Sequence, residues 1–205
     1  EINFQCSEYI EYIGNSAFNG SAWHENQPDG ILYLGDICLG YKGEKPAGRL
    51  QIKEGTRFIA ANAFRDCTEL TAVEFPNSVV YIGDIAFNGC TALSEINIPD
   101  NVLEIGYDCF INTKWYNDQP DGILYIDNAC IGVKGEISTA EPLQLKEGTR
   151  IIADYAFKET GIAGPLNLPD GLLAIGRMAF HILNGLTGEL KIPNTVKRLN
   201  VGAFD

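Results

Sequence analysis

The chain has 205 residues and a formal net charge of -12, from 27 Asp and Glu against 15 Lys and Arg. This acidic balance excludes nucleic acid as the expected partner and disfavours anionic membrane surfaces, because like charges repel. The sequence has no apolar run of about 18 residues, so we expect no membrane insertion. A hydrophobic content of 45% is enough to build a folded core.

An Ala-Phe dipeptide recurs along the chain. It occurs at Ala17-Phe18, Ala63-Phe64, Ala86-Phe87, Ala156-Phe157, Ala179-Phe180 and Ala203-Phe204, and Cys109-Phe110 occupies the same position in its repeat. Phe64, Phe87 and Phe110 are each 23 residues apart, and the other spacings are close to one or two such periods. Self-similarity at a fixed period of this length predicts a solenoid of stacked coils.

Apolar residues stand 14 and 12 positions before each Phe, as Leu50 and Ile52 do before Phe64. This two-residue alternation predicts a short strand with one buried face. Pro often follows, as at Pro76, and ends the strand because it lacks an N–H. We interpret the recurring Ile-Gly step, as at Ile82-Gly83, as the next bend. Stacked coils would align the strands in a parallel sheet and the Phe rings in a buried ladder. The remaining apolar pairs are Phe4 and Cys6, Val73 and Phe75, Ile96 and Ile98, Leu143 and Leu145, Leu166 and Leu168, and Leu190 and Ile192.

A longer block is also repeated. The stretch 23–44, WHENQPDGILYLGDICLGYKGE, returns 92 residues later at 115–136 as WYNDQPDGILYIDNACIGVKGE. Pro-Asp-Gly indicates a tight turn. The residues after it predict a β-hairpin of Ile31–Leu34 and Ile37–Tyr41 over Gly35-Asp36, with Asp127-Asn128 at the turn of the copy. We therefore expect hairpin-bearing units near residues 21–64 and 113–157, within a single solenoid domain spanning residues 1–205.

The best-kept unit is LSEINIPDNVLEIGYDCF at residues 93–110, and IGDIAFNGCTAL at 82–93 adds the end of the motif. Together they resemble the BspA-like, or Treponema pallidum type, leucine-rich-repeat family of bacterial surface proteins. The resemblance covers nearly the whole chain. It implies a curved right-handed solenoid with a parallel β-sheet on the concave face, a period of about 23 residues and two inserted hairpin units. Gly20, Thr160 and Leu183 depart from the Cys of the motif.

The same resemblance implies a secreted or surface-attached bacterial protein, of a family associated with adhesion to host proteins or other cells. A shared fold alone implies function weakly.

Six cysteines are present: Cys6, Cys38, Cys67, Cys90, Cys109 and Cys130. None forms a C-x-x-C pair, so we expect no zinc site. Cys38 and Cys130 are four coils apart, which at about 4.8 Å per strand is roughly 20 Å and beyond the reach of a disulfide. Cys67 and Cys90 are one coil apart with side chains expected to point the same way. We predict buried, reduced thiols that pack as small apolar groups.

Catalytic motifs are missing from the sequence. It has no nucleophile elbow, no H-E-x-x-H, no P-loop and no G-x-G-x-x-G. Only two histidines occur, and His24 stands beside Trp23 where the copy has Tyr116 after Trp115, so we interpret it as a surface residue. We therefore expect no enzymatic activity, no cofactor and no metal.

The outward positions of the predicted strands lie 15 and 13 residues before each Phe. The column at 13 reads Gln5, Gln51, Glu74, Asn97, Gln144, Asn167 and Lys191, and the column at 15 reads Asn3, Arg49, Ala72, Glu95, Pro142, Pro165 and Glu189. This face is polar and has no aromatic anchors of the kind found at interface hot spots. The predicted partner-binding residues are Gln51, Glu74, Glu95, Asn97, Gln144, Asn167 and Lys191.

These observations lead to one hypothesis and two alternatives. The hypothesis is a monomeric, non-enzymatic recognition module, extracellular or at the cell surface, that adheres to a protein of a host or a neighbouring cell. The first alternative is a glycan-binding module that uses Trp23, Trp115 and Tyr116, although we favour these rings as core where a coil is enlarged. The second alternative is a structural spacer without a ligand of its own.

Overall fold

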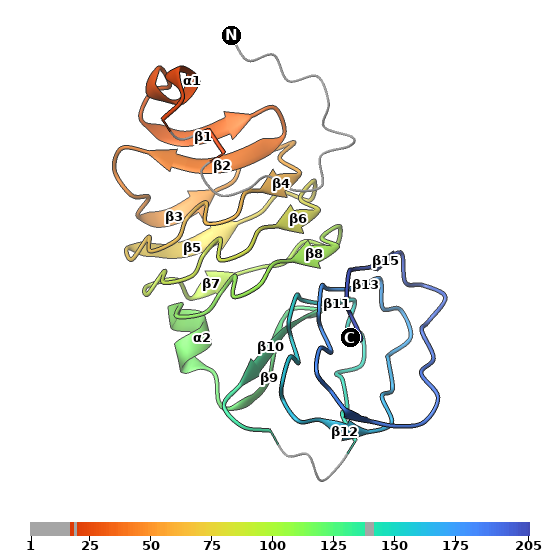
Figure 1. The fold of residues 1–205 in the computed structure, drawn as a ribbon. Helices are drawn as coiled ribbons and strands as arrows, with labels where there is room; N and C mark the ends of the chain where they lie inside the picture. Colours follow the sequence, from red (N-terminus) through yellow and green to blue (C-terminus); the bar gives the residue numbers. More distant parts are fainter. Residues whose placement is uncertain (1–16, 19, 138–141) are drawn as a thin grey trace. The chain divides into compact units, whose positions relative to one another are not determined.

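The computed structural model describes residues 17, 18, 20–137 and 142–205 (Figure 1). The chain divides into two compact units. Unit 1 is Glu1–Val102 with Asp108–Asp118, and unit 2 is Leu103–Tyr107 with Gln119–Asp205. In both units the chain winds as a β-solenoid with a period of about 23 residues, so that residues one period apart pair in parallel. The prediction of one domain over residues 1–205 remains a prediction.

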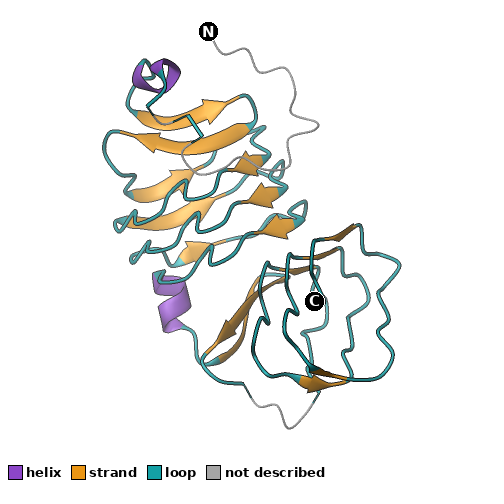
Figure 2. Ribbon diagram, in the orientation of Figure 1, coloured by secondary structure: helices purple, strands orange, loops and turns teal. Residues whose placement is uncertain are grey.

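The described part of unit 1 contains two sheets. One has the order β1 (Gly30–Leu34), β2 (Ile37–Lys42), β4 (Phe58–Ile59) and β6 (Tyr81–Ile82). The other has the order β3 (Gly48–Gln51), β5 (Leu70–Glu74) and β7 (Glu95–Ile96). In the second sheet Leu50 pairs with Val73, and Val73 with Ile96, which is the register predicted from the repeat. Two short helices, α1 (Ala22–Glu25) and α2 (Lys114–Asp118), complete the unit (Figure 2).

Unit 2 repeats this plan with a shorter second sheet. Its main sheet has the order β15 (Arg198–Leu199), β13 (Ala174–Ile175), β11 (Ile151–Ile152), β10 (Ala129–Lys134) and β9 (Gly122–Ile126). A second, two-stranded sheet pairs β12 (Ala163–Gly164) with β14 (Gly185–Leu186), and β8 (Glu104–Ile105) also belongs to this unit. The strand expected around Gln144 and Asn167 is reduced to a single parallel bridge between these two residues.

Both predicted hairpins are confirmed. β1 pairs antiparallel with β2, and β9 with β10, over the turns foreseen at 35–36 and 127–128. Each hairpin then adds its second strand, in parallel, to the next coil, through β4 and β11. A tyrosine hydroxyl links each hairpin to that coil by a hydrogen bond. The Tyr33 hydroxyl accepts from the Lys53 N–H at 3.1 Å, and the Tyr125 hydroxyl accepts from the Lys146 N–H at 3.0 Å. The block that returns 92 residues later therefore repeats in structure as well as in sequence.

The predicted Phe ladder forms the core. Phe64, Phe87 and Phe110 stack in unit 1 with centroid separations of 5.3 and 5.8 Å, and all three are fully buried. In unit 2, Phe157 stacks on Phe180 at 5.3 Å, and Phe180 on Phe204 at 5.2 Å. Because an aromatic ring buries a large apolar area, this stacking contributes favourable free energy to the packing of adjacent coils.

Two expectations need correction. The Ile-Gly step is more than a bend, because Ile82 and Ile175 lie in the two-residue strands β6 and β13, each in the sheet of its unit that also contains the hairpin. The glycine after each is required by space: a Cβ on Gly83 would come within 2.5 Å of the Ala61 nitrogen. The second correction concerns Leu190 and Ile192, which were expected to be buried and are 42% and 41% exposed. In the part of the chain that the structure describes, no helix is long and apolar enough to cross a membrane.

Candidate interaction surface

The sheet β3-β5-β7 separates an apolar row from a polar face. Leu50 and Val73 point into the core and are buried, whereas Arg49, Gln51 and Glu95 are exposed on the opposite side. Strand geometry requires this division, because successive side chains point to opposite faces of the sheet. Four of the seven predicted binding residues lie on this polar face or directly after its last strand: Gln51, Glu74, Glu95 and Asn97.

Arg49 joins the three strands of this face. Its guanidinium donates through Nη1 to Glu74 and through Nη2 to Glu95, each at 2.6 Å. Glu95 and Glu74 raise the pKa of Arg49 through these hydrogen bonds. All three side chains are about half exposed, so the ion pairs add little to stability. They do bring one guanidinium and two carboxylates together across the three strands.

Ala72 makes this arrangement possible. Strand register places Ala72 between Arg49 and Glu95 in the outward column. A methyl group there leaves room for the long Arg49 side chain to reach across β5 to β7. Ala72 is almost fully buried, although it belongs to the outward column. The polar face of unit 1 thus contains a group of one cation and two carboxylates, flanked by Gln51 and Asn97.

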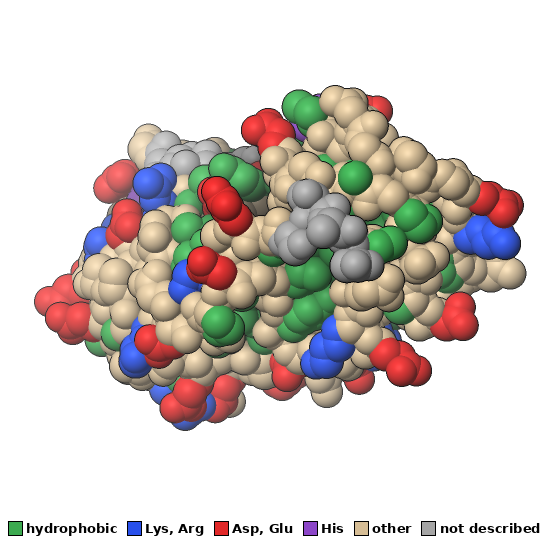
Figure 3. Space-filling view, turned by 90° about the horizontal axis from the view of Figure 1, so that it is seen from below, with side chains coloured by type: hydrophobic (Ala, Val, Ile, Leu, Met, Phe, Trp, Pro, Cys, Tyr) green, Lys and Arg blue, Asp and Glu red, His purple; other side chains and the backbone are tan. Residues whose placement is uncertain are grey.

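Unit 2 carries the other three predicted residues. Gln144 and Asn167 are exposed neighbours across the parallel bridge, so their amides lie side by side on one face. Lys191 is exposed and forms a 3.4 Å ion pair with Glu189. Each unit therefore has at least one pair of opposite charges in its outward columns. Acidic and basic side chains are also interspersed over the face shown in Figure 3.

Arg49 is the member of this surface that sequence reasoning missed. It stood in the outward column but was not among the predicted binding residues. A signal was available: an Arg with an acidic residue two periods later, Glu95, and another in the coil between, Glu74. Opposite charges in neighbouring strands attract when they face the same side.

The repeated tryptophans are neither core nor open surface. Trp23 lies on α1 and Trp115 on α2, and neither helix contains a buried residue. The Trp23 ring packs against Phe18 with a centroid distance of 5.4 Å. The interpretation of these rings as core is therefore wrong, because they are only half-buried.

The rest of each repeated block holds these helices in place. Lys42 Nζ donates to the carbonyls of Glu25 and Gln27 at 2.7 and 2.8 Å, and Lys134 Nζ donates to the Gln119 carbonyl. Both lysines thereby supply hydrogen bonds to carbonyls at the helix end and in the following turn, which lack a partner within the helix.

The described cysteines are free and buried, as predicted; Cys6 lies outside the described residues. Burial raises the pKa of Cys38, Cys90 and Cys130 to about 12. Thiols with such values are protonated at neutral pH and are poor nucleophiles. Within the described ranges, no group of three or more His, Cys, Asp or Glu side chains is placed to hold a metal ion. The groups that the structure exposes are suited to hydrogen bonding and ion pairing.

A match to a protein-family model agrees with this architecture. The sequence matches the model of the BspA type leucine-rich repeat region (6 copies) over residues 2–116, 57–139 and 134–205. A comparison with curated protein sequences gave no significant match. Among solved structures, a leucine-rich-repeat protein of T. pallidum is 22% identical with a TM-score of 0.43, and the match covers 83% of this chain and 78% of that one.

Two further solved structures are similar over a smaller share of their own length. A leucine-rich-repeat protein from Bacteroides ovatus is 20% identical, with a TM-score of 0.39 and coverage of 80% of this chain and 36% of that chain. The pneumococcal vaccine antigen PcpA is 21% identical, with a TM-score of 0.35 and coverage of 72% and 49%. This chain therefore spans less than half the length of these two proteins. The family match itself extends over nearly all of the sequence, and the chain belongs to the family of proteins with a BspA type leucine-rich repeat region.

Proposed function

We propose that this chain is a non-enzymatic recognition module that binds a protein partner through the outward side chains of its stacked strands. Leucine-rich repeats are a protein-interaction module and generally serve as non-enzymatic scaffolds. The observation that carries the proposal is the group formed by Arg49, Glu74 and Glu95, in which one guanidinium holds two carboxylates on neighbouring strands at 2.6 Å. Side chains that are already ordered lose less conformational freedom on binding.

The chemistry of this face suggests the kind of partner. Two carboxylates share one guanidinium, so the group carries a net negative charge, and amides flank it at Gln51 and Asn97. A protein surface with hydrogen-bonding and basic groups complements it. In unit 2, Gln144, Asn167 and Lys191 offer the same types of polar group. We place the module outside the cell or at its surface, with adhesion to a host or neighbouring-cell protein as its role, since the family resemblance implies that setting.

Two other functions remain alternatives. A glycan site would use Trp23, Trp115 and Tyr116. These residues are half-buried, and lysine hydrogen bonds hold the short helices that carry them against the hairpins. A spacer would need no ligand. Neither alternative is favoured by a particular contact among the described residues.

The test is binding to an array of purified extracellular-matrix proteins and glycans. The variant Gln51→Ala, Glu74→Ala, Asn97→Ala removes three polar side chains of the face, including one of the two carboxylates bound by Arg49. Glu54→Ala, Glu69→Ala, Asn77→Ala serves as the control because these exposed residues lie outside the outward columns. We expect saturable binding to a protein by the natural chain and the control, and its loss in the face variant at unchanged thermal stability.

Other outcomes would overturn the proposal. Saturable binding to glycans alone, lost on Trp23→Ala and Trp115→Ala, would establish the glycan alternative. No binding by the folded chain would favour the spacer. A heat-unfolded sample distinguishes recognition by the fold from nonspecific adhesion.

A further inference from the structure

Unit 2 has a hollow beside the hairpin strand β10, which we call the β10 hollow. Its volume is about 330 Å³, and it is lined by Val133, Gly135, Glu136, Ile137, Glu159 and Thr160. Of these described residues, two are acidic and none is basic. Glu136 and Ile137 also line an adjoining hollow of about 340 Å³, which reaches Asp121 and Gln144. The concave surface therefore extends to a residue of the candidate interaction surface.

Unit 1 carries different side chains at the same place. Tyr41 is the counterpart of Val133, and the two hairpins have the same pairing register there. Lys45 is likewise the counterpart of Ile137, 92 residues earlier. Unit 1 thus has a phenol and an ammonium where the β10 hollow is lined by two aliphatic side chains.

Both of these side chains bind the turn that follows Phe64. Lys45 Nζ donates to the Asp66 carbonyl at 2.8 Å. The Tyr41 hydroxyl donates to the Cys67 sulfur. The phenol and the ammonium of the chain itself therefore cover this turn in unit 1.

The corresponding turn of unit 2 keeps the acceptor groups and lacks the two donors. Glu159 is the counterpart of Asp66, with a φ of 58° against 57°, so the backbone turns in the same way. Thr160 is the counterpart of Cys67. Its hydroxyl donates to the Phe157 carbonyl at 2.8 Å, and its lone pairs can still accept a hydrogen bond. A phenol and a cation in the β10 hollow would meet the same kinds of acceptor as in unit 1.

The hairpin of unit 2 also contacts the next coil less closely than the hairpin of unit 1 does. A Cβ added to Gly40 would lie 2.5 Å from the Ala63 oxygen. A Cβ added to its counterpart, Gly132, would lie 3.4 Å from the Ala156 oxygen. The looser contact in unit 2 accompanies the space beside β10 that unit 1 fills with its own side chains.

We propose that the β10 hollow binds a phenolic ring with a neighbouring cation, supplied by a tyrosine and a lysine of a polypeptide partner. Unit 1 is the template for this ligand, and the carboxylates of Glu136 and Glu159 attract the cation. Glu159 is also paired with Lys158 at 3.3 Å, so Glu136 is the carboxylate to test. A polypeptide suits the site better than a small molecule because the concave surface continues toward Gln144. The site lies in unit 2 and does not depend on the proposed role of the sheet β3-β5-β7.

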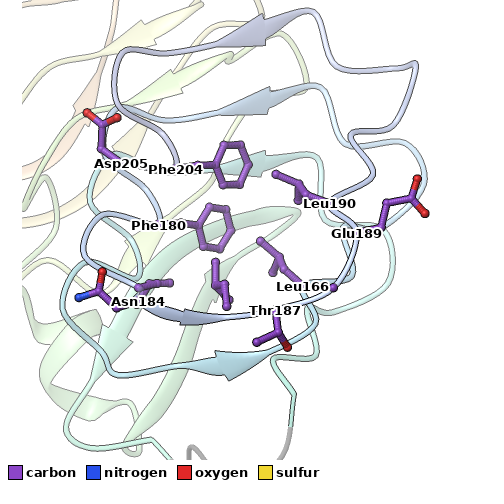
Figure 4. Close-up of a pocket in the computed structure, with 11 residues that line it drawn as sticks. Leu166, Phe180, Asn184, Thr187, Glu189, Leu190, Phe204 and Asp205 are labelled. Carbon is purple, nitrogen blue, oxygen red and sulfur yellow. The ribbon is translucent and has the colours of Figure 1, made fainter.

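Unit 2 has another hollow, of about 260 Å³, which serves as a control site. It lies beside the stacked rings of Phe180 and Phe204, and Figure 4 shows Thr187 and Glu189 among the residues that line it. This hollow lies outside the repeated block, so unit 1 supplies no template for a ligand there.

The first test uses two peptides with sequences from the chain itself. Residues 41–45, YKGEK, carry the phenol and the cation, and residues 133–137, VKGEI, are the matched control. Ligand-observed NMR, with saturation transferred from the whole protein, should show saturable binding of the first peptide through its ring protons. The second peptide lacks both groups and should not bind. Equal binding of the two peptides, or no binding of either, would contradict the proposal.

Variants of the protein then locate the site. Val133→Tyr combined with Ile137→Lys places the side chains of unit 1 in the β10 hollow and should abolish binding of the YKGEK peptide. Glu136→Lys, at an exposed position, should weaken binding because like charges repel. Thr187→Trp, in the control hollow, should leave binding intact, and thermal unfolding checks that each variant is folded. Binding that persists in both variants of the β10 hollow, or that only Thr187→Trp removes, would overturn the proposal.

Tyramine, a small molecule with a phenol and an ammonium, distinguishes the source of the ligand. We expect tyramine to compete with the YKGEK peptide and to bind more weakly, because it makes no contact beyond the β10 hollow. Binding of tyramine without binding of the peptide would assign the hollow to free aromatic amines and would rule out the polypeptide partner.

Discussion

Phe157 and Phe180 are one 23-residue period apart in the sequence, and their rings stack with centroids 5.3 Å apart and planes 4° from parallel. This separation is close to the distance of about 4.8 Å between neighbouring strands. The ring ladder and the parallel strands therefore advance together from coil to coil. Each coil is stabilised by its neighbours more than by contacts within itself, as expected of a repeat protein.

Removing a ring from the middle of the ladder should be costly. Phe87 stacks on Phe64 and Phe110 and is also contacted edge-on by Phe75. We expect Phe87→Ala to lower the free energy of unfolding by about 3–5 kcal/mol, because it leaves a cavity with rings on both sides. Urea unfolding followed by circular dichroism measures this. Tyr107→Ala, at an exposed ring, is the comparison and should cost much less. A Phe87→Ala protein as stable as the natural chain would contradict the ladder.

Relieving backbone strain should stabilise the chain. Ile182 has a φ of 58° and its side chain is 46% exposed. A β-branched residue is disfavoured in this left-handed region, whereas Asn tolerates it. We expect Ile182→Asn to raise the free energy of unfolding by about 1 kcal/mol. Ile182→Val keeps the β-branch and should give no gain. Destabilisation by the Asn variant, measured by thermal unfolding, would show that the Ile182 side chain matters more than its backbone.

The Ile-Gly steps should not accept a larger residue. A Cβ on Gly83 would lie 2.5 Å from the Ala61 nitrogen, and a Cβ on Gly176 would lie 2.5 Å from the Asp154 nitrogen. Both contacts are with backbone, so no side chain can move away to relieve them. We expect Gly83→Ala and Gly176→Ala each to cost about 1–3 kcal/mol, as in an overpacked core. Unchanged melting temperatures in both variants would mean that adjacent coils are farther apart than described.

The buried thiols should make the protein sensitive to alkali. The pKa of Cys38 and Cys130 is raised by burial from 9.0 to about 12. Between these values the unfolded thiol loses its proton and the folded one keeps it. The stabilising contribution is therefore fully present below about pH 9 and is lost as the pH rises toward 12, at roughly 1.4 kcal/mol per pH unit for each thiol.

Urea unfolding at pH 8 and pH 10 checks this. The variant Cys38→Ala, Cys130→Ala should lose less stability between the two pH values than the natural chain does, whatever its stability at pH 8. An identical loss in both proteins would contradict the burial of these thiols.

Much of this fold could be predicted from the sequence because the same residue types recur at the same positions in several repeats. The period, the ladder through Phe87 and both hairpins follow from residues that recur at fixed spacing. The parallel strands that extend each hairpin sheet were missed because strands of two residues, such as β6 and β13, are too short to show alternation. The bridge at Gln144 and Asn167 also could not be foreseen, since their coils carry the same apolar spacing as those with full strands.

The candidate surface was predicted less completely. Strand alternation correctly placed Gln51 and Glu95 on the outward side of unit 1. The pairing of Arg49 with two carboxylates depends on the small side chain of Ala72 in the coil between. It therefore could be predicted only by considering residues of three successive coils together. The half-buried tryptophans were misjudged because composition shows that Trp is apolar and does not show that a short helix carries it.

Carboxyl footprinting of the chain, free and bound to a protein identified on the array, tests the central claim most directly. Carbodiimide labelling read by mass spectrometry reports the accessibility of each carboxylate. We predict that binding slows labelling of Glu74 and Glu95 and leaves Glu54 and Glu69, outside the outward columns, unchanged. Unchanged labelling of Glu74 and Glu95 in a saturated complex would contradict recognition through the β3-β5-β7 face.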